Sequence, residues 1–545
     1  MPEKKQNIDR SVREYVQPSR VVIVEGDVQH AELLLDAAAD QVGLGKQEYV
    51  RCKGKCRIVL DFGRELRGGL RILMGGGPNS VSVRLRLGES VGESLADIGQ
   101  KGCTSDHALR DMTVRLPMLS DQQFFDSGFR FACIEFPEES TDVYLKAVNA
   151  VYVHSGREQL GSFECSDELI NRIYAVAAHT VQLCSADYIW DGIKRDRLVW
   201  VGDLYPEITA FLSLCADDGC VARSLDFVKA ETPLPRWMND FPMYSMWWII
   251  ILEEYYRMTG NAGYVQEQRA YYERLIGQID ACIGEDGDFD FGMNFVDWPT
   301  HGHADEPEGV RSLCKLCARC GLRLEKLFGS ATGSAENILN KLSRKGTEVT
   351  EKKQIVALKY LSGTPVSEKE RSLLTEGGAK GFSTFMSGFL LTALSDLGGE
   401  EMSLAALREY YGAMLSLGAT SFWEDFDLDW LQGNVSPIDR LPLPGEKDIH
   451  GDFGKFCYTG YRHSLCHGWS AGIIPFLIKR IVGVSIEEAG YKKVRIAPRL
   501  GGLKFAKAAI PTPYGILRID CREENGKTVV KASAPAEVEV QIAEN

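Results

Sequence analysis

The chain has 545 residues, of which 44% are hydrophobic and 25% charged, and its formal net charge is −14. A chain of this length is expected to fold into more than one domain. Its negative charge disfavours nucleic acid and anionic membrane surfaces as partners, whereas a neutral ligand such as a sugar is compatible with it. A homo-oligomer is also compatible with this composition.

The cysteines and the N-terminus indicate the compartment. Fifteen cysteines, an odd number, are spread over the whole chain, unlike the dense disulfide framework of small secreted domains. The first twenty residues, "MPEKKQNIDRSVREYVQPSR", are polar and lack the apolar core of a signal peptide. The longest strongly apolar run, "MWWIIIL" at 246–252, is too short to cross a bilayer. We therefore expect a reduced, cytoplasmic protein.

The first part of the chain reads as β structure. Residues 20–155 contain short β-branched or alternating runs such as "CRIVLDFG" and "SVSVRLRLG", most of them separated by Gly, Pro or Asn. The segment "GGLRILMGGGPNSVSVRL" predicts two strands around a glycine-rich turn. That turn lacks the Gly-Lys-Ser/Thr of a phosphate-binding loop, so we do not expect phosphate binding there. The pattern predicts an N-terminal β-sandwich domain over residues 1–159.

The pattern becomes helical near residue 160. In "SDELINRIYAVAAHTVQLC", Ser166 is the expected N-cap, and Leu169, Ile173 and Val176 recur at helical spacing. Further helical segments are predicted at about 203–217, 244–259, 263–283, 308–328, 335–344, 350–362, 383–396, 401–417 and 465–482. No repeat of fixed period indicates a solenoid. Residues 160–485 are therefore predicted to form an all-α domain, either a bundle or a barrel of helical hairpins. Alternating strands over 486–545 predict a small C-terminal β-sandwich.

One loop between predicted helices is unusually rich in charge and tryptophan. The stretch "DGIKRDRLVWVGD" at 191–203 contains three carboxylates, Asp191, Asp196 and Asp203, together with Trp200. A solvated loop with local ion pairs is the simpler alternative. Carbohydrate sites, however, combine carboxylates that accept hydrogen bonds from hydroxyls with flat aromatic faces that pack against sugar rings. The tryptophans therefore favour a sugar site.

A second cluster of the same kind follows much later. "GATSFWEDFDLDW" at 418–430 has Glu424 and Asp425 between Trp423 and Trp430. An acidic loop without function is again the alternative. Together, the two clusters supply carboxylates from distant parts of the chain, and glycoside hydrolysis requires such a pair.

Six motifs, taken in their order along the chain, resemble the α-L-rhamnosidases of glycoside hydrolase family 78. They are "GREQLGSFECSDELINRIY", "DGIKRDRLVWVGD", "YSMWWIIILEEYYRMTGN", "FVDWP", "TSFWEDFD" and "SLCHGWSAG". The resemblance extends from about residue 55 to about 520. It implies a catalytic (α/α)6 barrel between β-sandwich domains, and hydrolysis with inversion at the anomeric carbon.

The resemblance also implies catalytic roles for two carboxylates. The general acid of the family, a glutamate, falls on Asp196, and its general base falls on Glu424. Aspartate at position 196 is a departure, because its carboxyl group reaches about one methylene less far and general acid catalysis depends on hydrogen-bond reach. The flanking Arg195 and Arg197 favour the ionised form of this acid, so burial and nearby carboxylates must oppose them.

Other positions are implied to hold the sugar. Asp191, Arg195 and Asp203 match residues that contact sugar hydroxyls in the family, and His467 matches a histidine of the same pocket. Three tryptophans and one further acid complete the predicted substrate-binding set: Trp200, Asp297, Trp298 and Trp423.

Three further motifs suggest metal sites but are better explained otherwise. "HGH" at 301–303 has no further ligands at useful spacing, so a wall of the sugar pocket is preferred. "DGDFDFG" at 286–292 lacks the glycine that a calcium loop needs at its sharp turn, and predicts an Asp-Gly turn. "CKLCARC" at 314–320 places three thiols on one helix face, where buried cysteine is common. His179 is expected to be a satisfied core histidine. We expect no metal and no cofactor.

The leading hypothesis is an inverting exo-glycosidase that releases terminal α-L-rhamnose. One alternative is another (α/α)6-barrel enzyme, such as a hydrolase of unsaturated uronyl sugars, which would need a cationic clamp for the uronate. The other is a non-catalytic sugar-binding relative, with Asp196 as the sign of decay.

Overall fold

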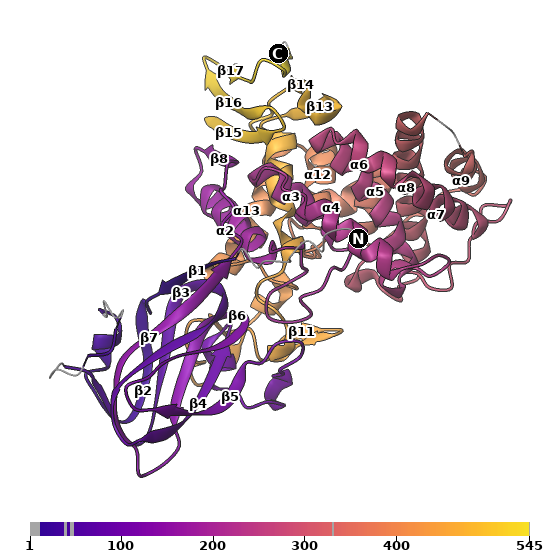
Figure 1. The fold of residues 1–545 in the computed structure, drawn as a ribbon. Helices are drawn as coiled ribbons and strands as arrows, with labels where there is room; N and C mark the ends of the chain where they lie inside the picture. The colour runs from indigo at the N-terminus through magenta and orange to yellow at the C-terminus, as the bar shows by residue number, and fades with distance from the viewer. Residues whose placement is uncertain (1–10, 37–40, 44–47, 330–331, 544–545) are drawn as a thin grey trace, which may run out of the picture.

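The computed structural model describes residues 11–36, 41–43, 48–329 and 332–543. The first ten residues, on which the expectation of no signal peptide partly rests, lie outside these ranges. Figure 1 shows a sheet built from the N-terminal third, a group of helices beside it, and a small set of C-terminal strands at the opposite end of the molecule from that sheet. The predicted order of β, α and β regions is confirmed.

The N-terminal strands form one hydrogen-bonded sheet with the order β1-β7-β3-β6-β4-β5, and β2 pairs with β3 outside this path. Its strands are β1 (Val12–Val16), β2 (Arg20–Gln29), β3 (Val50–Gly76), β4 (Ser80–Gly88), β5 (Asp111–Pro117), β6 (Asp121–Phe136) and β7 (Asp142–His154). The predicted strands on either side of the glycine-rich turn are β3 and β4, but each pairs with other strands and not with its neighbour. A separate apolar core lies within this region. The sandwich layout stays a prediction.

The helices follow the predicted segments closely. They are α2 (Glu168–Cys184), α3 (Leu204–Leu214), α4 (Cys220–Glu231), α5 (Pro242–Thr259), α6 (Ala262–Glu267), α7 (Arg269–Ala281), α8 (Glu306–Phe328), α9 (Ser334–Ser343), α10 (Lys353–Leu361), α11 (Glu368–Thr375), α12 (Ser387–Gly398), α13 (Glu400–Ser416) and α14 (Ile473–Phe476). Two helices, α4 and α11, were not predicted; α11 has only eight residues and buries a single apolar side chain, Leu374, so its periodicity is weak. None of the helices in the described ranges is long and apolar enough to span a lipid bilayer.

One predicted helix cap was wrong by a residue. The carboxylate of Asp167, and not the hydroxyl of Ser166, accepts the backbone N–H groups of Leu169 and Ile170 at the start of α2. Ser166 Oγ instead accepts the backbone N–H of Lys504, at 2.9 Å. Ser166 therefore joins the helical region to the C-terminal strands.

The helices are arranged in a cycle. In the order α3, α5, α8, α10, α12 and α14, each helix contacts the next, and α14 contacts α3 again. Four further helices pack against members of this cycle: α2 against α3, α9 against α8, α11 against α10 and α13 against α12. A closed cycle is not the order of a solenoid, and the barrel itself stays a prediction.

The C-terminal strands form two sheets. β13 (Val484–Glu488), β14 (Lys493–Ile496) and β18 (Glu539–Ile542) form one, and β15 (Phe505–Thr512), β16 (Gly515–Glu524) and β17 (Lys527–Ser533) belong to the other. β8 (Ser162–Cys165) pairs with β15, although it lies in the sequence before the first helix (Figure 1). This strand thus lies within the residues predicted as the helical domain but pairs with a C-terminal strand. Four two-residue strands lie between α13 and α14: β9 (Val435–Ser436), β10 (Lys447–Asp448), β11 (Gly454–Lys455) and β12 (Tyr458–Thr459).

Candidate active site

The loop between α2 and α3 carries the first acidic cluster and is held from outside by the N-terminal sheet. Arg197 donates hydrogen bonds to the backbone carbonyl and the carboxylate of Asp126, at 2.6 and 3.1 Å. The Trp190 ring lies 4.5 Å from the Arg67 guanidinium and 5.0 Å from that of Arg197. Asp196 and Arg197 both have a φ of 56°, a left-handed conformation that is uncommon outside glycine. These contacts fix an irregular backbone in one conformation.

The loop after α13 carries Glu424 and is held equally firmly. The backbone N–H of Ser464 donates to Glu424 Oε2 at 3.1 Å, and the backbone N–H of Glu424 donates to the Ser464 carbonyl at 3.0 Å. The indole N–H of Trp469 (3.0 Å) and the hydroxyl of Thr384 both donate to the Glu424 carbonyl. The carboxylate can therefore change position only if its surroundings move.

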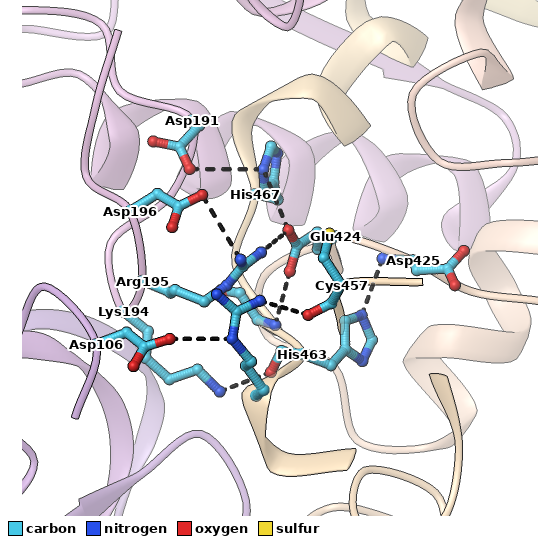
Figure 2. A network of polar contacts seen from close by, with 12 residues as sticks. Asp106, Asp191, Lys194, Arg195, Asp196, Glu424, Asp425, Cys457, His463 and His467 are labelled. Atoms are coloured by element: carbon cyan, nitrogen blue, oxygen red, sulfur yellow. Dashed lines mark hydrogen bonds and ion pairs between the residues drawn. The ribbon is translucent and has the colours of Figure 1, made fainter. Parts of the chain in front are cut away.

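Arg195 brings the two loops together, as Figure 2 shows. Its guanidinium forms an ion pair with Glu424 and lies 3.6 Å from Oδ2 of Asp196. The Glu424 side chain is 3% exposed, whereas that of Asp196 is 17% exposed. Burial raises the pKa of Glu424, and Arg195 and the Ser464 N–H act in the opposite direction. The two predicted catalytic carboxyls thus share one cation but have different access to solvent.

His467 lies among the acids on the inner side of this network. Its Nε2 is 3.9 Å from carboxylate oxygens of Asp191, Asp203 and Glu424. Burial lowers the pKa of His467 well below its usual value, and the nearby Arg195 lowers it further. The imidazole is therefore neutral at physiological pH, and within the described ranges its Nδ1 has no hydrogen-bond partner.

Asp191 and Asp203 are buried beside this imidazole. The backbone N–H of Leu198 donates to Asp191 at 2.8 Å, and the Tyr244 hydroxyl donates to Asp203 at 3.0 Å. Burial raises the pKa of each well above its usual value, and the neighbouring carboxylates add to the effect. Acids that retain a proton can both donate hydrogen bonds to hydroxyl groups and accept them.

The predicted aromatic residues differ in their surroundings. Trp200 packs edge-on against Tyr244, with ring centroids 6.3 Å apart, and Trp298 stacks on Phe456 at 5.6 Å. Phe456 is itself 45% exposed, so this stack lies at the surface. Trp423 is fully buried and packs against Phe426 at 5.5 Å. The sugar-binding roles of these tryptophans stay predictions.

Asp297 has a local structural role. One carboxylate oxygen accepts the backbone N–H of Trp298 at 2.8 Å, and the other accepts the Ser383 hydroxyl. Burial raises its pKa to about 6. Both oxygens thus already have partners within the protein, and its contact with a sugar stays a prediction.

Sequence reasoning missed a buried charged network that connects the N-terminal sheet to this site. Lys194 Nζ lies 2.9 Å from Glu89 and 3.2 Å from Glu93, and it also donates to the carbonyls of Tyr461 and His463. Lys194 lies in the charged loop, but no local pattern there indicates that its partners come from 101 or more positions away.

The same network contains the group of candidate metal ligands that the described residues bring together: Glu89, Glu93 and His450. His450 already contacts Ser90 Oγ at 2.8 Å and the His463 carbonyl at 2.9 Å. The Lys194 ammonium lies beside both carboxylates. The Lys194 ammonium thus balances the negative charge of Glu89 and Glu93.

The three motifs that suggested metal lie elsewhere. Cys314, Cys317 and Cys320 are buried on α8, as predicted. Asp286 accepts the backbone N–H of Asp288 at 3.1 Å in a turn with Gly287 at a φ of 85°, which confirms the Asp-Gly turn. His301 and His303 each face an acid of the adjoining helix start, Glu306 at 3.3 Å and Asp305 at 3.6 Å. His179 is bound to the Glu65 carbonyl at 2.8 Å, as expected of a satisfied histidine.

Comparison with known families agrees with this geometry. Residues 158–321 match the bacterial alpha-L-rhamnosidase 6 hairpin glycosidase domain, and residues 483–543 match the bacterial alpha-L-rhamnosidase C-terminal domain. Both matched domains are thus domains of bacterial α-L-rhamnosidases. Its predicted domain boundaries, at 160 and 486, lie close to the limits of these two matches.

Individual relatives of the family are distant and mostly longer. A curated alpha-L-rhamnosidase from Formosa agariphila is 23% identical over 475 residues, which cover 77% of this chain and 48% of that protein. The chain thus spans about half the length of this curated relative.

The solved structures share the fold. A family GH78 rhamnosidase of Bacillus sp. GL1 matches with a TM-score of 0.72 at 22% identity, covering 94% of this chain and 55% of that one. A rhamnosidase from Klebsiella oxytoca, solved with rhamnose bound, matches with a TM-score of 0.67 at 18% identity and covers 86% of this chain and 96% of that one.

Proposed function

We propose that this chain is a glycosidase that releases terminal α-L-rhamnose with inversion, using Asp196 as general acid and Glu424 as general base. The observation that carries the proposal is the position of these carboxyls on either side of Arg195. Glu424 is buried, and a guanidinium and a backbone N–H favour its ionised form, which a base requires. Asp196 is on the more open side, where a leaving group can depart.

The proposed reaction needs one proton transfer at each carboxyl. Asp196 gives its proton to the glycosidic oxygen as the bond from that oxygen to the anomeric carbon breaks, and the oxygen keeps the electron pair. Glu424 takes a proton from a water molecule that attacks the opposite face of the sugar. Inversion requires room for this water, so we predict a carboxyl separation of roughly 6.5–9.5 Å.

The electrostatics of the site favour such a transition state. Asp191, Asp196, Asp203 and Glu424 surround one guanidinium and one neutral imidazole. The sugar ring gains positive charge as the glycosidic bond breaks, and the Glu424 carboxylate and the acceptor oxygens of Asp191 and Asp203 can stabilise it. Asp203 is the rival acid, but it is buried and bound to Tyr244, which supports Asp196.

The two domain matches and the helix order also support the predicted architecture. We place the catalytic site at one end of an (α/α)6 barrel formed by residues 160–485, with β-sandwich domains on both sides. The cyclic order of the inner helices is what such a barrel requires.

The alternatives are less well supported. A uronyl hydrolase needs a free cation for the carboxylate of its substrate, yet Arg195 pairs with Glu424 and Lys194 pairs with Glu89 and Glu93. A non-catalytic relative need not retain a buried base held by an arginine and a backbone N–H, both of which are present.

A substrate screen tests the proposal. We expect hydrolysis of an aryl α-L-rhamnoside, and little or none of the matching α-L-arabinoside and β-glucuronide. Proton NMR of the first product formed should show the β anomer, the product of inversion. Selective cleavage of the glucuronide would favour the uronyl hydrolase, and binding of rhamnose without any hydrolysis would favour the non-catalytic relative.

A further inference from the structure

A histidine from the N-terminal region reaches the proposed acid. His107 lies in the loop between the short turn Gln100–Gly102 and β5, far in sequence from the helical region. Its Nδ1 is 2.9 Å from the backbone nitrogen of Asp196 and 3.0 Å from the carboxyl oxygen Oδ1 of the same residue. A single ring nitrogen thus contacts both the backbone and the side chain of Asp196.

The backbone contact determines which ring nitrogen carries a proton. The Asp196 N–H is a donor, so Nδ1 must offer a lone pair, and the proton of a neutral imidazole is then on Nε2. The single lone pair of Nδ1 is thus committed to the backbone N–H of Asp196. The carboxyl oxygen Oδ1 of the same residue is held beside the ring, 3.0 Å from Nδ1.

The two oxygens of Asp196 face different groups. Oδ2 lies 3.6 Å from Arg195 Nη1, toward the buried side, whereas Oδ1 faces His107, whose side chain is 49% exposed. The other charged groups around Asp196 are Asp191, Asp203 and Glu424. On the side of His107, the nearby charge is Asp106. Oδ1 is thus the oxygen on the open side, away from the guanidinium.

The loop that carries His107 is fixed from two directions. Asp106 pairs with Arg462 Nε at 3.0 Å, which connects the loop to the segment before His463. Arg110, which is buried, donates to the Leu87 carbonyl at 2.9 Å. His107 itself has a φ of 59°, a conformation that asparagine and glycine adopt more readily than most residues.

We propose that His107 is a positioning residue for the general acid: its Nδ1 accepts the backbone N–H of Asp196 and fixes the left-handed backbone that presents the carboxyl group on the leaving-group side. The inference rests on the proposed function for the role of Asp196. This positioning also compensates for the shorter side chain of aspartate, because a carboxyl group with less reach depends more on being held in the right place.

Two variants of His107 separate this role from support of the loop. His107→Asn keeps an acceptor near the position of Nδ1 and tolerates the left-handed backbone. His107→Gly tolerates the same backbone but removes the acceptor. Ala108→Gly, in the same loop, is the matched control for added flexibility.

We expect His107→Gly to lower kcat roughly tenfold on a rhamnoside with an alkyl leaving group, the effect of losing one hydrogen bond to the acid. On a nitrophenyl rhamnoside, whose nitrophenolate leaves without needing a proton, the loss of kcat should be less than about threefold. KM and the inhibition constant of free rhamnose should be unchanged. His107→Asn and Ala108→Gly should stay within about threefold of the unmodified enzyme on both substrates. An equal loss on both substrates, or an Asn variant as impaired as the Gly variant, would overturn the inference.

A second measurement does not depend on activity. In protein labelled with 15N-histidine, the signals that disappear in His107→Asn should include an unprotonated Nδ1, and Asp196→Asn should shift that signal. A protonated Nδ1, or a signal that does not respond to Asp196→Asn, would contradict the contact. If the unmodified chain cleaves no rhamnoside, the proposed function fails and this signal still decides the inference.

Discussion

Arg195 and Glu424, 229 positions apart in the sequence, form a buried ion pair between the two acidic loops. Neither loop has regular secondary structure at the contact. The pair connects two distant points of the chain within the helical region, and its guanidinium favours the ionised form of the carboxylate proposed as the base.

Variants of Asp196 and Glu424 should differ in how strongly their loss of rate depends on the leaving group. Asp196→Asn should lower cleavage of an alkyl rhamnoside about 100-fold or more, the contribution of a general acid, and spare much of the rate on a nitrophenyl rhamnoside. Glu424→Gln should impair both, and azide should partly restore it by replacing the activated water. Steady-state kinetics on both substrates checks this. If Asp203→Asn shows the leaving-group dependence instead, Asp203 is the acid.

Removing the guanidinium should change the pH dependence of the reaction. Arg195 lowers the pKa of Glu424 against the effect of burial, so Arg195→Gln should raise that pKa. The base must be ionised, so the acid limb of kcat/KM should move to higher pH, by about one unit or more. Arg197→Gln is the control, because its guanidinium binds Asp126 outside the pocket. An unchanged acid limb in Arg195→Gln would show that another group controls it.

The buried network of Lys194 should stabilise the association of the N-terminal sheet with the helical region. Lys194→Met leaves Glu89 and Glu93 buried without this cation and should lower the free energy of unfolding by about 3–5 kcal/mol. Lys101→Met breaks a half-exposed pair with Asp452 and should cost at most about 1 kcal/mol. Denaturant titration of both variants compares them, and similar losses would show that burial does not matter here.

Asp425 should make stability depend on pH. Burial raises its pKa from 3.8 to about 7, and the neighbouring Asp297 and Glu424 add to this. The folded chain therefore binds this proton more tightly than the unfolded chain, and stability is lost as pH rises from about 4 through about 7. Asp425→Asn should remove this loss and raise Tm at pH 8 relative to the unmodified protein by a few degrees. The exposed carboxylate of the same loop supplies the control, Asp429→Asn, whose slope of Tm against pH should match that of the unmodified protein.

Chelation should not affect activity. Glu89, Glu93 and His450, the ligand group that the described residues bring together, have Lys194 beside their carboxylates. Prolonged dialysis against EDTA should therefore leave hydrolysis of an aryl rhamnoside unchanged. A large loss that calcium or zinc restores would contradict this prediction.

The sequence by itself determined the order of the regions and most of the site. Apolar periodicity marks the strands and helices, because side chains alternate every two residues in a strand and every 3.6 in a helix. The clusters around Asp196 and Glu424 were visible because carboxylates and tryptophans are rare neighbours in an ordinary loop. Missed elements such as α11 are short and polar, so periodicity is weak there.

Only the tertiary structure decided which distant residues meet. The pairing of β8 with β15 across more than 340 positions (Figure 1), the contact of Lys194 with Glu89, and the approach of His107 to Asp196 have no local signal. Each depends on where the N-terminal sheet and the C-terminal strands pack against the helices. The ionisation of the site could not be predicted from the sequence either. Burial is the largest cause of the pKa shifts at Asp191, Asp203 and Glu424, and burial is a property of the folded chain.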